Sequence, residues 1–156
     1  MSHTIRPATQ SDQAFIREML YEALFVPPDH EPFPRSVLDQ PDIAHYADGF
    51  GTHPGDVCLI AETTGERVAA AWVRLLQGDD RGYGHIDDDT PELSVAVRPR
   101  WRNQGIGTAL LLRLVETLPR VSLSVDSRNP AVRLYEQLGF EVVAVEHKSL
   151  TMLRQP

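Results

Sequence analysis

Two glycines stand at the start of an apolar helical pattern. Gly105 and Gly107 flank Ile106, and from there to Leu118 apolar residues recur with the spacing of one helix face. The N-terminus of a helix carries unpaired N–H groups and the positive end of the helix dipole, so an anion can bind there. Positive charge beside it comes from Arg98, Arg100 and Arg102. The stretch therefore predicts a site for a phosphate-bearing ligand.

Two common phosphate-binding motifs do not fit this loop. The dinucleotide-binding fingerprint would place a third glycine at position 110, where the chain has Leu110. The P-loop of ATP-binding proteins needs Gly-Lys followed by Ser or Thr, and the sequence contains no such triplet.

Three segments resemble motifs of the GCN5-related N-acetyltransferase (GNAT) superfamily. Arg102–Gly107 resembles its Arg/Gln-x-x-Gly-x-Gly/Ala signature, Ile5–Thr9 its first strand, and Asn129–Phe140 its second motif. The segments follow the family's order and span almost the whole chain. Each motif alone is weak evidence, whereas the combination is highly specific.

The resemblance implies that acetyl-CoA is the co-substrate and that no metal is needed. In that family the glycine loop binds the pyrophosphate, and the pantetheine runs along a strand whose backbone N–H stabilises the oxyanion. The positions that the resemblance assigns to the cofactor are Val95, Ala96, Val97, Arg102, Asn103, Gln104, Gly105, Ile106, Gly107, Thr108 and Asn129.

Two of these positions depart from the family pattern. Asn103 stands where the family usually has glycine, but asparagine tolerates a left-handed backbone better than most residues do. Arg128 occupies the place of the family's usual asparagine, and Asn129 follows it by one residue. Which of the two side chains contacts the cofactor is left open.

Acetyl transfer to an amine needs a base for the amine proton and an acid for the leaving thiolate. Tyr135 falls on the family's general-acid tyrosine, and a phenol can protonate a thiolate because its pKa is higher; otherwise Tyr135 is a packed aromatic side chain. Glu92 is the candidate base, with a solvated carboxylate at the strand end as an equal alternative. His85 is a weaker candidate base.

An acidic loop, Gly78–Thr90, precedes the proposed catalytic strand. It carries the aspartates Asp79, Asp80, Asp87, Asp88 and Asp89. Metal-ligand spacing of the EF-hand type is absent, so a solvated acidic loop is favoured over a metal site. We also expect this loop to give the amine site a negative potential.

Composition narrows the class of partner and compartment. The 156 residues carry a net charge of −7, which disfavours nucleic acid and suits a cationic amine. The single Cys58 excludes an internal disulfide and fits a reducing cytoplasm. Because the sequence shows no signal peptide and no apolar stretch near 20 residues, we expect a cytoplasmic protein without membrane contact.

The positioning elements can be placed from hydrophobic periodicity and turn residues. The pattern predicts strands at 3–8, 57–61, 68–76, 93–97, 121–125, 140–145 and 149–153, and helices from Thr9 or Ser11 to 24, at 37–38, 43–47 and 106–118, and from Asn129 to Gly139. A proline-rich connection spans 26–35. We expect a GNAT-like α/β fold: a mixed β-sheet with splayed central strands and helices on both faces.

The sequence thus predicts a single acetyl-CoA-dependent N-acetyltransferase domain over residues 1–156. It would move the acetyl group to a primary amine of a small molecule or a peptide by direct attack, without an acyl-enzyme. The alternative is a CoA-binding sensor or regulatory domain without turnover, which the presence of Tyr135 disfavours. A homodimer is possible.

Overall fold

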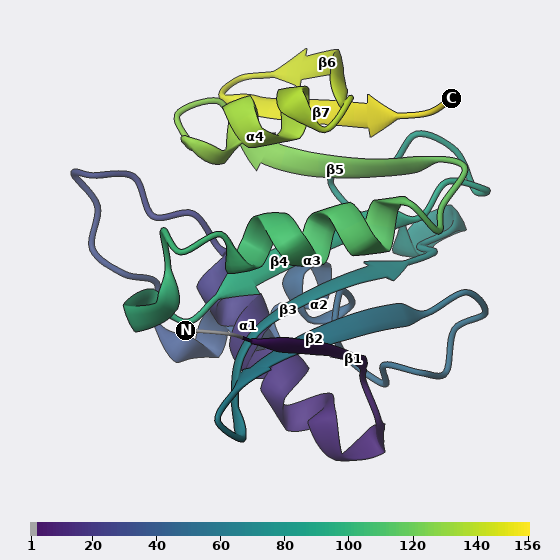
Figure 1. Ribbon diagram of the computed structural model, residues 1–156. Coiled ribbons are helices and arrows are strands. Elements are labelled where there is room, and N and C mark those ends of the chain that lie inside the picture. Colours follow the sequence, from purple (N-terminus) through teal and green to yellow (C-terminus); the bar gives the residue numbers. More distant parts are fainter. Residues whose placement is uncertain (1–2) are drawn as a thin grey trace.

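The protein is built on one seven-stranded mixed sheet, which a computed structural model describes for residues 3–156. The strand order is β1-β2-β3-β4-β5-β7-β6, with β1 and β6 at the two edges (Figure 1). β4 and β5 are parallel, and every other neighbouring pair is antiparallel. The strands are β1 Thr4–Pro7, β2 Val57–Thr63, β3 Glu66–Arg74, β4 Glu92–Val97, β5 Val121–Asp126, β6 Glu141–Glu146 and β7 Ser149–Arg154.

Helices cover both faces of the sheet. In Figure 1, α3 and α4 lie in front of the strands, and α1 and α2 lie behind them. The α-helices are α1 Gln13–Ala23, α2 Pro41–Ala44, α3 Ile106–Val115 and α4 Ala131–Gln137; short 3₁₀ turns are η1 Gln10–Asp12, η2 Arg35–Asp39, η3 Gly78–Asp80 and η4 Pro99–Trp101. None of the helices in residues 3–156 is both long and apolar enough to span a bilayer.

The central strand β3 separates two hydrophobic cores. Ala69, Ala71 and Val73 belong to the core beneath α3, while Ala70 and Trp72 belong to the core beneath α1. Successive side chains of a strand point to opposite faces, so a strand covered on both sides needs apolar side chains on both faces, as residues 68–73 provide. The three alanines leave room for a helix to approach each face closely.

The two parallel strands in the middle of the sheet diverge. β4 pairs with β3 at six positions, from Arg74–Glu92 to Ala69–Val97. With β5, the same strand pairs only through Glu92 and Ser122. Beyond that point the strands separate, which confirms the expected splay and opens the sheet where β4 ends.

The predicted architecture is confirmed, with small differences at the element ends. The third helix stops at Val115 instead of Leu118, because the Thr117 hydroxyl donates to the Leu114 carbonyl (2.7 Å) and closes the last turn. The fourth helix begins at Ala131, one residue after Pro130. The side chain of Asn129 nevertheless caps it, with Oδ1 accepting the Ala131 N–H at 2.9 Å.

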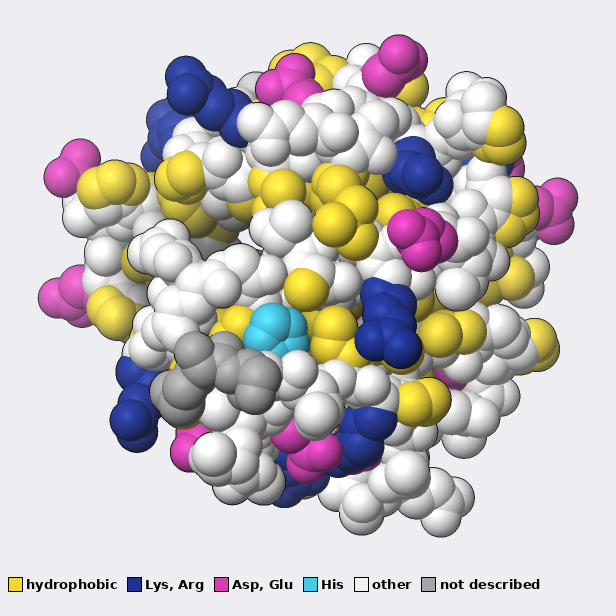
Figure 2. Space-filling view, viewed as in Figure 1, with side chains coloured by type: hydrophobic (Ala, Val, Ile, Leu, Met, Phe, Trp, Pro, Cys, Tyr) yellow, Lys and Arg dark blue, Asp and Glu magenta, His cyan; other side chains and the backbone are white. Residues whose placement is uncertain are grey.

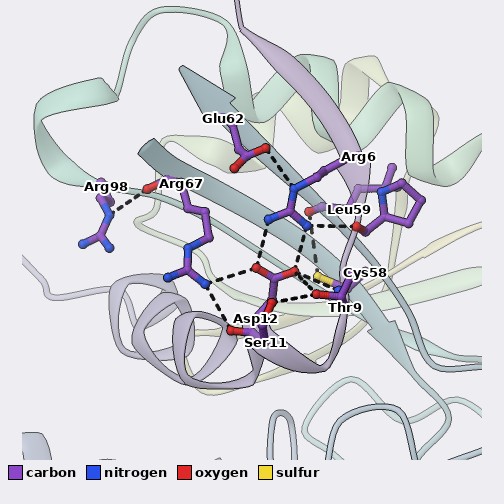
Figure 3. A network of polar contacts seen from close by, with 10 residues as sticks. Arg6, Thr9, Ser11, Asp12, Cys58, Leu59, Glu62, Arg67 and Arg98 are labelled. Carbon is purple, nitrogen blue, oxygen red and sulfur yellow. Dashed lines mark hydrogen bonds and ion pairs between the residues drawn. The ribbon is translucent and has the colours of Figure 1, made fainter. Parts of the chain in front are cut away.

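A buried carboxylate joins the N-terminal segment to the sheet (Figure 3). Asp12 is fully buried, and both its oxygens accept from the guanidinium of Arg6, at 2.8 and 3.0 Å. It also accepts from Arg67 on β3 (3.1 Å) and from the Thr9 backbone N–H (2.8 Å). The Arg6 guanidinium holds the pKa of Asp12 well below its usual range. One side chain therefore fixes β1, the start of α1 and β3 together.

Replacing Asp12 with alanine should cost about 2 kcal/mol of unfolding free energy, because it leaves the Arg6 and Arg67 contacts without an acceptor. Since the folded pKa is depressed, this stabilisation is complete above the unfolded pKa and is lost as pH falls below about 4. Urea unfolding at pH 7 and pH 3 tests this: the gap between wild type and Asp12→Ala should narrow at pH 3.

The matched control is Asp39→Ala, which also removes a carboxylate 2.8 Å from an arginine. The Asp39 side chain is 74% exposed, so its loss should cost well under 1 kcal/mol. Equal losses in the two variants would contradict the role given to Asp12.

Candidate active site

Two pockets open where β4 and β5 diverge. The larger pocket, about 770 Å³, lies along β4, the N-terminus of α3, the start of α4 and the segment after α1. The smaller pocket, about 380 Å³, lies between β4, β5, α1 and residues 43–46 and 83. Six residues line both pockets: Ala23, Leu24 and Phe25 at the end of α1, Val95 on β4, and Asn129 and Tyr135. Two ligands held in the two pockets would therefore meet along this shared wall, which includes Val95, Asn129 and Tyr135.

The N-terminus of α3 forms one end of the larger pocket. Gly105 precedes the helix with a left-handed backbone (φ +81°), and Asn103 is also left-handed (φ +62°), as its residue type permits. The first N–H to find an acceptor is that of Ala109, which donates to the Gly105 carbonyl (3.0 Å). Within residues 3–156, the N–H groups of residues 106–108 have no acceptor, which is the arrangement that binds an anion.

Gly107 lets the N-terminus of α3 lie close to β4. A Cβ atom built there would lie 3.4 Å from Cγ2 of Val97, so the helix and β4 are already in close contact. The surface is hollowed beside this helix end, between it and the projecting segment after α1 (Figure 2). Tyr21 holds that segment by donating to the Phe33 carbonyl (2.5 Å).

The positive charge near the loop comes mainly from Arg102. Its Nε donates to the Val97 carbonyl (3.0 Å), and the residue lines the larger pocket. Arg98 instead stacks over the ring of Phe15, 5.1 Å from the centroid, and Arg100 lies over the ring of Trp101. Neither of these two arginines lines the larger pocket, so two of the three predicted charges point elsewhere.

Most of the predicted cofactor residues border the larger pocket. The predicted residues among its lining are Val95, Ala96, Val97, Arg102, Asn103, Gly105, Ile106, Gly107, Thr108 and Asn129. Gln104 is outside the lining, and its side chain donates to the Arg100 carbonyl (3.4 Å). That these residues bind a cofactor stays a prediction.

The structure separates Asn129 from Arg128. Arg128 is exposed, lines neither pocket and forms a two-point ion pair, at 2.9 and 2.8 Å, with Asp126, which borders the smaller pocket. Asn129 lines both pockets while its Oδ1 caps α4, which leaves the amide nitrogen available to donate to a ligand. Asn129 is therefore the better placed of the two to contact a bound ligand.

Tyr135 lies at the junction of the two pockets. Its side chain comes from α4 and packs against Phe140, with ring centroids 5.8 Å apart. The residue is 8% exposed, and its hydroxyl makes no hydrogen bond within the described part of the chain. Burial raises the pKa of Tyr135 to about 12, so the phenol keeps its proton at neutral pH. The group is thus a protonated donor without a partner, facing the opening.

Glu92 is buried, so the alternative interpretation of Glu92 as a solvated carboxylate at the strand end is wrong. It is 2% exposed and sits at the one position where β4 pairs with β5. Oε1 accepts from the Tyr46 hydroxyl (3.1 Å) and the Gly84 N–H (3.0 Å), and Oε2 accepts from the Gly82 N–H (2.9 Å). Three of its roughly four acceptor positions are filled, and it still lines the smaller pocket.

Tyr46 is a site residue that sequence reasoning missed. Its hydroxyl donates to Glu92, accepts the Tyr83 N–H (2.7 Å) and borders the smaller pocket. Burial and the neighbouring Glu92 raise its pKa, so it stays protonated. Trp72 fixes its backbone by donating to the Tyr46 carbonyl (2.9 Å). No local motif marks a tyrosine that meets its partner 46 residues away.

Arg74 holds the neighbouring residues against β3. It is buried, pairs with Asp56 (3.1 Å) and donates to the carbonyls of His45 (3.0 Å) and Gly49 (2.9 Å). A buried guanidinium with this many acceptors fixes the backbone of an otherwise irregular segment. Through it, the 45–49 segment places the Tyr46 phenol beside Glu92.

Two glycines let the acidic loop approach Glu92. A Cβ at Gly82 would lie 2.3 Å from Oε1 of Glu92 and 2.4 Å from the Tyr46 hydroxyl, and one at Gly84 would lie 2.7 Å from the Leu123 carbonyl carbon. No side chain fits at either position. The Gly-Tyr-Gly spacing was a signal available in the sequence, because paired glycines often mark a close backbone approach.

The aspartates of the same loop are not part of the lining of the smaller pocket, and the negative potential expected from them stays a prediction. Asp87 accepts from Thr90 (2.8 Å) and pairs with Arg120 (3.3 Å), and Asp80 contacts His45 (2.9 Å). His85 borders a separate surface pocket with Asp42 and His45. The members of the loop and its strand end that reach the smaller pocket are Tyr83 and Glu92. Among residues 3–156, no group of three or more His, Cys, Asp or Glu side chains is arranged to hold a metal ion.

Gly82→Ala should lower the unfolding free energy by about 1–3 kcal/mol, because the added methyl group collides with two side chains that cannot both move. Thermal or urea unfolding measures this. Asp89→Ala, an exposed change in the same loop, should stay within about 0.5 kcal/mol of wild type. If the Gly82→Ala and Asp89→Ala proteins have the same unfolding free energy, the loop does not pack closely against Glu92.

Comparison with solved structures finds the same fold in other proteins. A structure of yncA from Salmonella typhimurium with its cofactor acetyl-CoA superposes with a TM-score of 0.66 at 24% identity, covering 99% of this chain and 94% of that one. At this identity the likeness shows the fold alone.

Two relatives match part of the sequence. Mycothiol acetyltransferase of Acidothermus cellulolyticus is 36% identical over 97 residues, which cover 54% of this chain and 30% of the relative. The L-amino acid N-acetyltransferase AaaT of Escherichia coli is 29% identical over 96 residues, covering 57% of this chain and 56% of that protein. The chain thus spans less than two thirds of either relative. A model of the Acetyltransferase (GNAT) family matches residues 16–140, most of the chain, and the protein belongs to that family.

Proposed function

We propose that this protein is an N-acetyltransferase that moves the acetyl group of acetyl-CoA to a primary amine of a small molecule or peptide by direct attack. The observation that carries the proposal is the pair of pockets that meet at Val95, Asn129 and Tyr135. A transfer between two substrates needs two sites that share one reacting point. Family membership supports the same reaction.

In this proposal the larger pocket holds acetyl-CoA. Its pyrophosphate would lie against the free N–H groups of residues 106–108, with Arg102 beside it. The pantetheine would follow the backbone of Val95, Ala96 and Val97, which lines the pocket on the side where β4 leaves β5. Asn129, at the junction, would contact the cofactor from α4.

The smaller pocket would hold the amine. The amine nitrogen attacks the thioester carbonyl carbon, the C–N bond forms, and the C–S bond breaks. A backbone N–H of β4 would stabilise the oxyanion. Tyr135 would give its proton to the departing thiolate, for which a protonated, unpartnered phenol at the junction is suited. Glu92 would receive the amine proton through its one remaining acceptor position or through a water.

The cellular setting and assembly belong to the same proposal. The buried Cys58 thiol and the absence of other cysteines suit a reducing cytoplasm. A homodimer stays a prediction, and size-exclusion chromatography with light scattering would test it.

The decisive experiment supplies acetyl-CoA with a panel of primary amines and follows the release of CoA thiol together with the mass of the acetylated amine. Transfer is supported if thiol release depends on the amine and the product is about 42 Da heavier than the amine, which is the mass gained when an acetyl group replaces a hydrogen. CoA binding without amine-dependent turnover would identify the protein as a CoA-binding protein without transferase activity, and would contradict the proposal.

Gly107→Glu should weaken CoA binding at least about tenfold, because a carboxylate beside the pyrophosphate places like charges together. An acidic residue in the first turn of a helix is otherwise stabilising, so the fold should persist. Isothermal titration calorimetry with CoA measures the affinity.

The control is Gly107→Ala, whose methyl group would lie at van der Waals distance from Val97 and carries no charge. Its affinity should stay within a few-fold of wild type. If folded Gly107→Glu binds CoA as well as Gly107→Ala does, the anion site is elsewhere.

Tyr135→Phe should reduce kcat by about 10²–10⁴-fold, the usual contribution of general acid catalysis, and should leave CoA affinity nearly unchanged. The change keeps the ring and removes only the hydroxyl. Steady-state kinetics with a competent amine gives kcat, and calorimetry gives the affinity.

Phe140→Leu serves as the packing control, because Phe140 contacts the Tyr135 ring but carries no proton donor. Its kcat should fall by less than about tenfold, below the range of general acid catalysis. A Tyr135→Phe enzyme with kcat within about threefold of wild type would reject the acid role.

A further inference from the structure

We propose that the acceptor is a primary amine with an apolar body and no carboxylate beside its nitrogen, such as an arylalkylamine or an amino acid whose carboxyl is blocked as an amide. This refinement rests on the proposed function, because it takes the smaller pocket as the acceptor site. The argument comes from the charges that line this pocket and from their partners.

The lining of the smaller pocket contains no cation. Among the described residues that border it, none is lysine, arginine or histidine. A ligand carboxylate would therefore leave water without gaining a charged partner, which costs several kcal/mol in a buried site. The pocket lacks the arginine or lysine that usually recognises a carboxylate.

Two carboxylates line the same pocket, and they differ in how their charge is balanced. Asp126 is held by the guanidinium of Arg128 through two hydrogen bonds, so its charge is already compensated. Glu92 is 2% exposed, and within residues 3–156 it has no lysine, arginine or histidine partner. Its partners are two backbone N–H groups and the Tyr46 hydroxyl.

A buried carboxylate without a counter-ion is unusual in a folded protein, because such charges are normally paired. An incoming ammonium group would supply the missing positive charge beside Glu92. A carboxylate attached to the neighbouring carbon would lie close to the same Glu92 oxygens and would be repelled. The pocket thus favours the amine end of a ligand and rejects an adjacent acid.

The rest of the wall is suited to an apolar body. Half of the lining consists of aliphatic and phenylalanine side chains from α1 and the two residues after it, from α2 and from both diverging strands: Leu20, Ala23, Leu24, Phe25, Ile43, Leu93, Val95, Leu123 and Val125. Besides Glu92 and Asp126, the rest is neutral and polar: Tyr46, Tyr83, Ser94, Ser124, Asn129, Tyr135 and Ser149. An aryl or alkyl group would bury apolar surface against these side chains.

The test compares three ligands that share one side chain: 2-phenylethylamine, phenylalanine amide and phenylalanine. With saturating acetyl-CoA, kcat/KM is measured for each by thiol release. We expect turnover of the first two and a kcat/KM for phenylalanine at least about tenfold below that of its amide, because like charges oppose binding.

A matched variant separates the pocket from the acidic loop. Asp79→Asn combined with Asp89→Asn removes two charges from loop side chains that lie outside the smaller pocket. If Glu92 and the absence of cations from the pocket lining set the preference, the ratio of kcat/KM for phenylalanine amide to kcat/KM for phenylalanine stays within about twofold of the wild-type ratio. A preference that disappears in this variant would assign it to the loop and overturn the proposal.

The other outcomes are equally distinct. Phenylalanine turned over as well as its amide overturns the inference and leaves acetyl transfer standing. Acetylation of none of the three ligands, by a protein that does acetylate another primary amine, also overturns it. Absence of transfer to any amine would instead refute the proposed function itself.

Discussion

The site depends on the way two parallel strands, β4 and β5, pair at one position only. β4 and β5 pair only through Glu92 and Ser122, and beyond them each strand follows a different neighbour. A parallel sheet normally continues its hydrogen bonds along the whole strand. Here the divergence leaves backbone and side chains of both strands facing an opening, and both pockets lie in it. The site is therefore a consequence of the way the sheet is built.

Glu92 connects this opening to the loops around it. It stands at the paired position, and its carboxylate collects one hydroxyl and two backbone N–H donors from segments far apart in the sequence. Tyr46 and the Gly82–Gly84 loop gain their positions from these contacts. The Ser122 hydroxyl adds a bond to the Gly84 carbonyl (2.6 Å) from the other strand. One acidic side chain thus fixes the wall of the smaller pocket and supplies its charge.

The larger pocket relies on backbone N–H groups at its anion-binding end, with one arginine, Arg102, in its lining. The free N–H groups of α3, the left-handed Asn103 and Gly105, and the close contact of Gly107 with Val97 form its anion-binding end. Two neighbouring arginines stack on aromatic rings, so they contribute to packing. Local backbone geometry of this kind is encoded within a few residues, whereas the smaller pocket requires several segments that are distant in the sequence to meet.

That difference explains what the sequence by itself determined. The order of strands and helices, the glycine loop, the left-handed Asn103 and the position of Tyr135 after a capped helix start all follow from residue types at short spacing. The burial of Glu92, the approach of Tyr46 and the exclusion of the loop aspartates from the pocket were decided only by the tertiary structure. They depend on contacts between residues 8 to 46 positions apart, such as Tyr46 with Glu92 and Gly84 with Glu92. Strand register and buried anchors such as Arg74 set these contacts, and neither leaves a local pattern in the sequence.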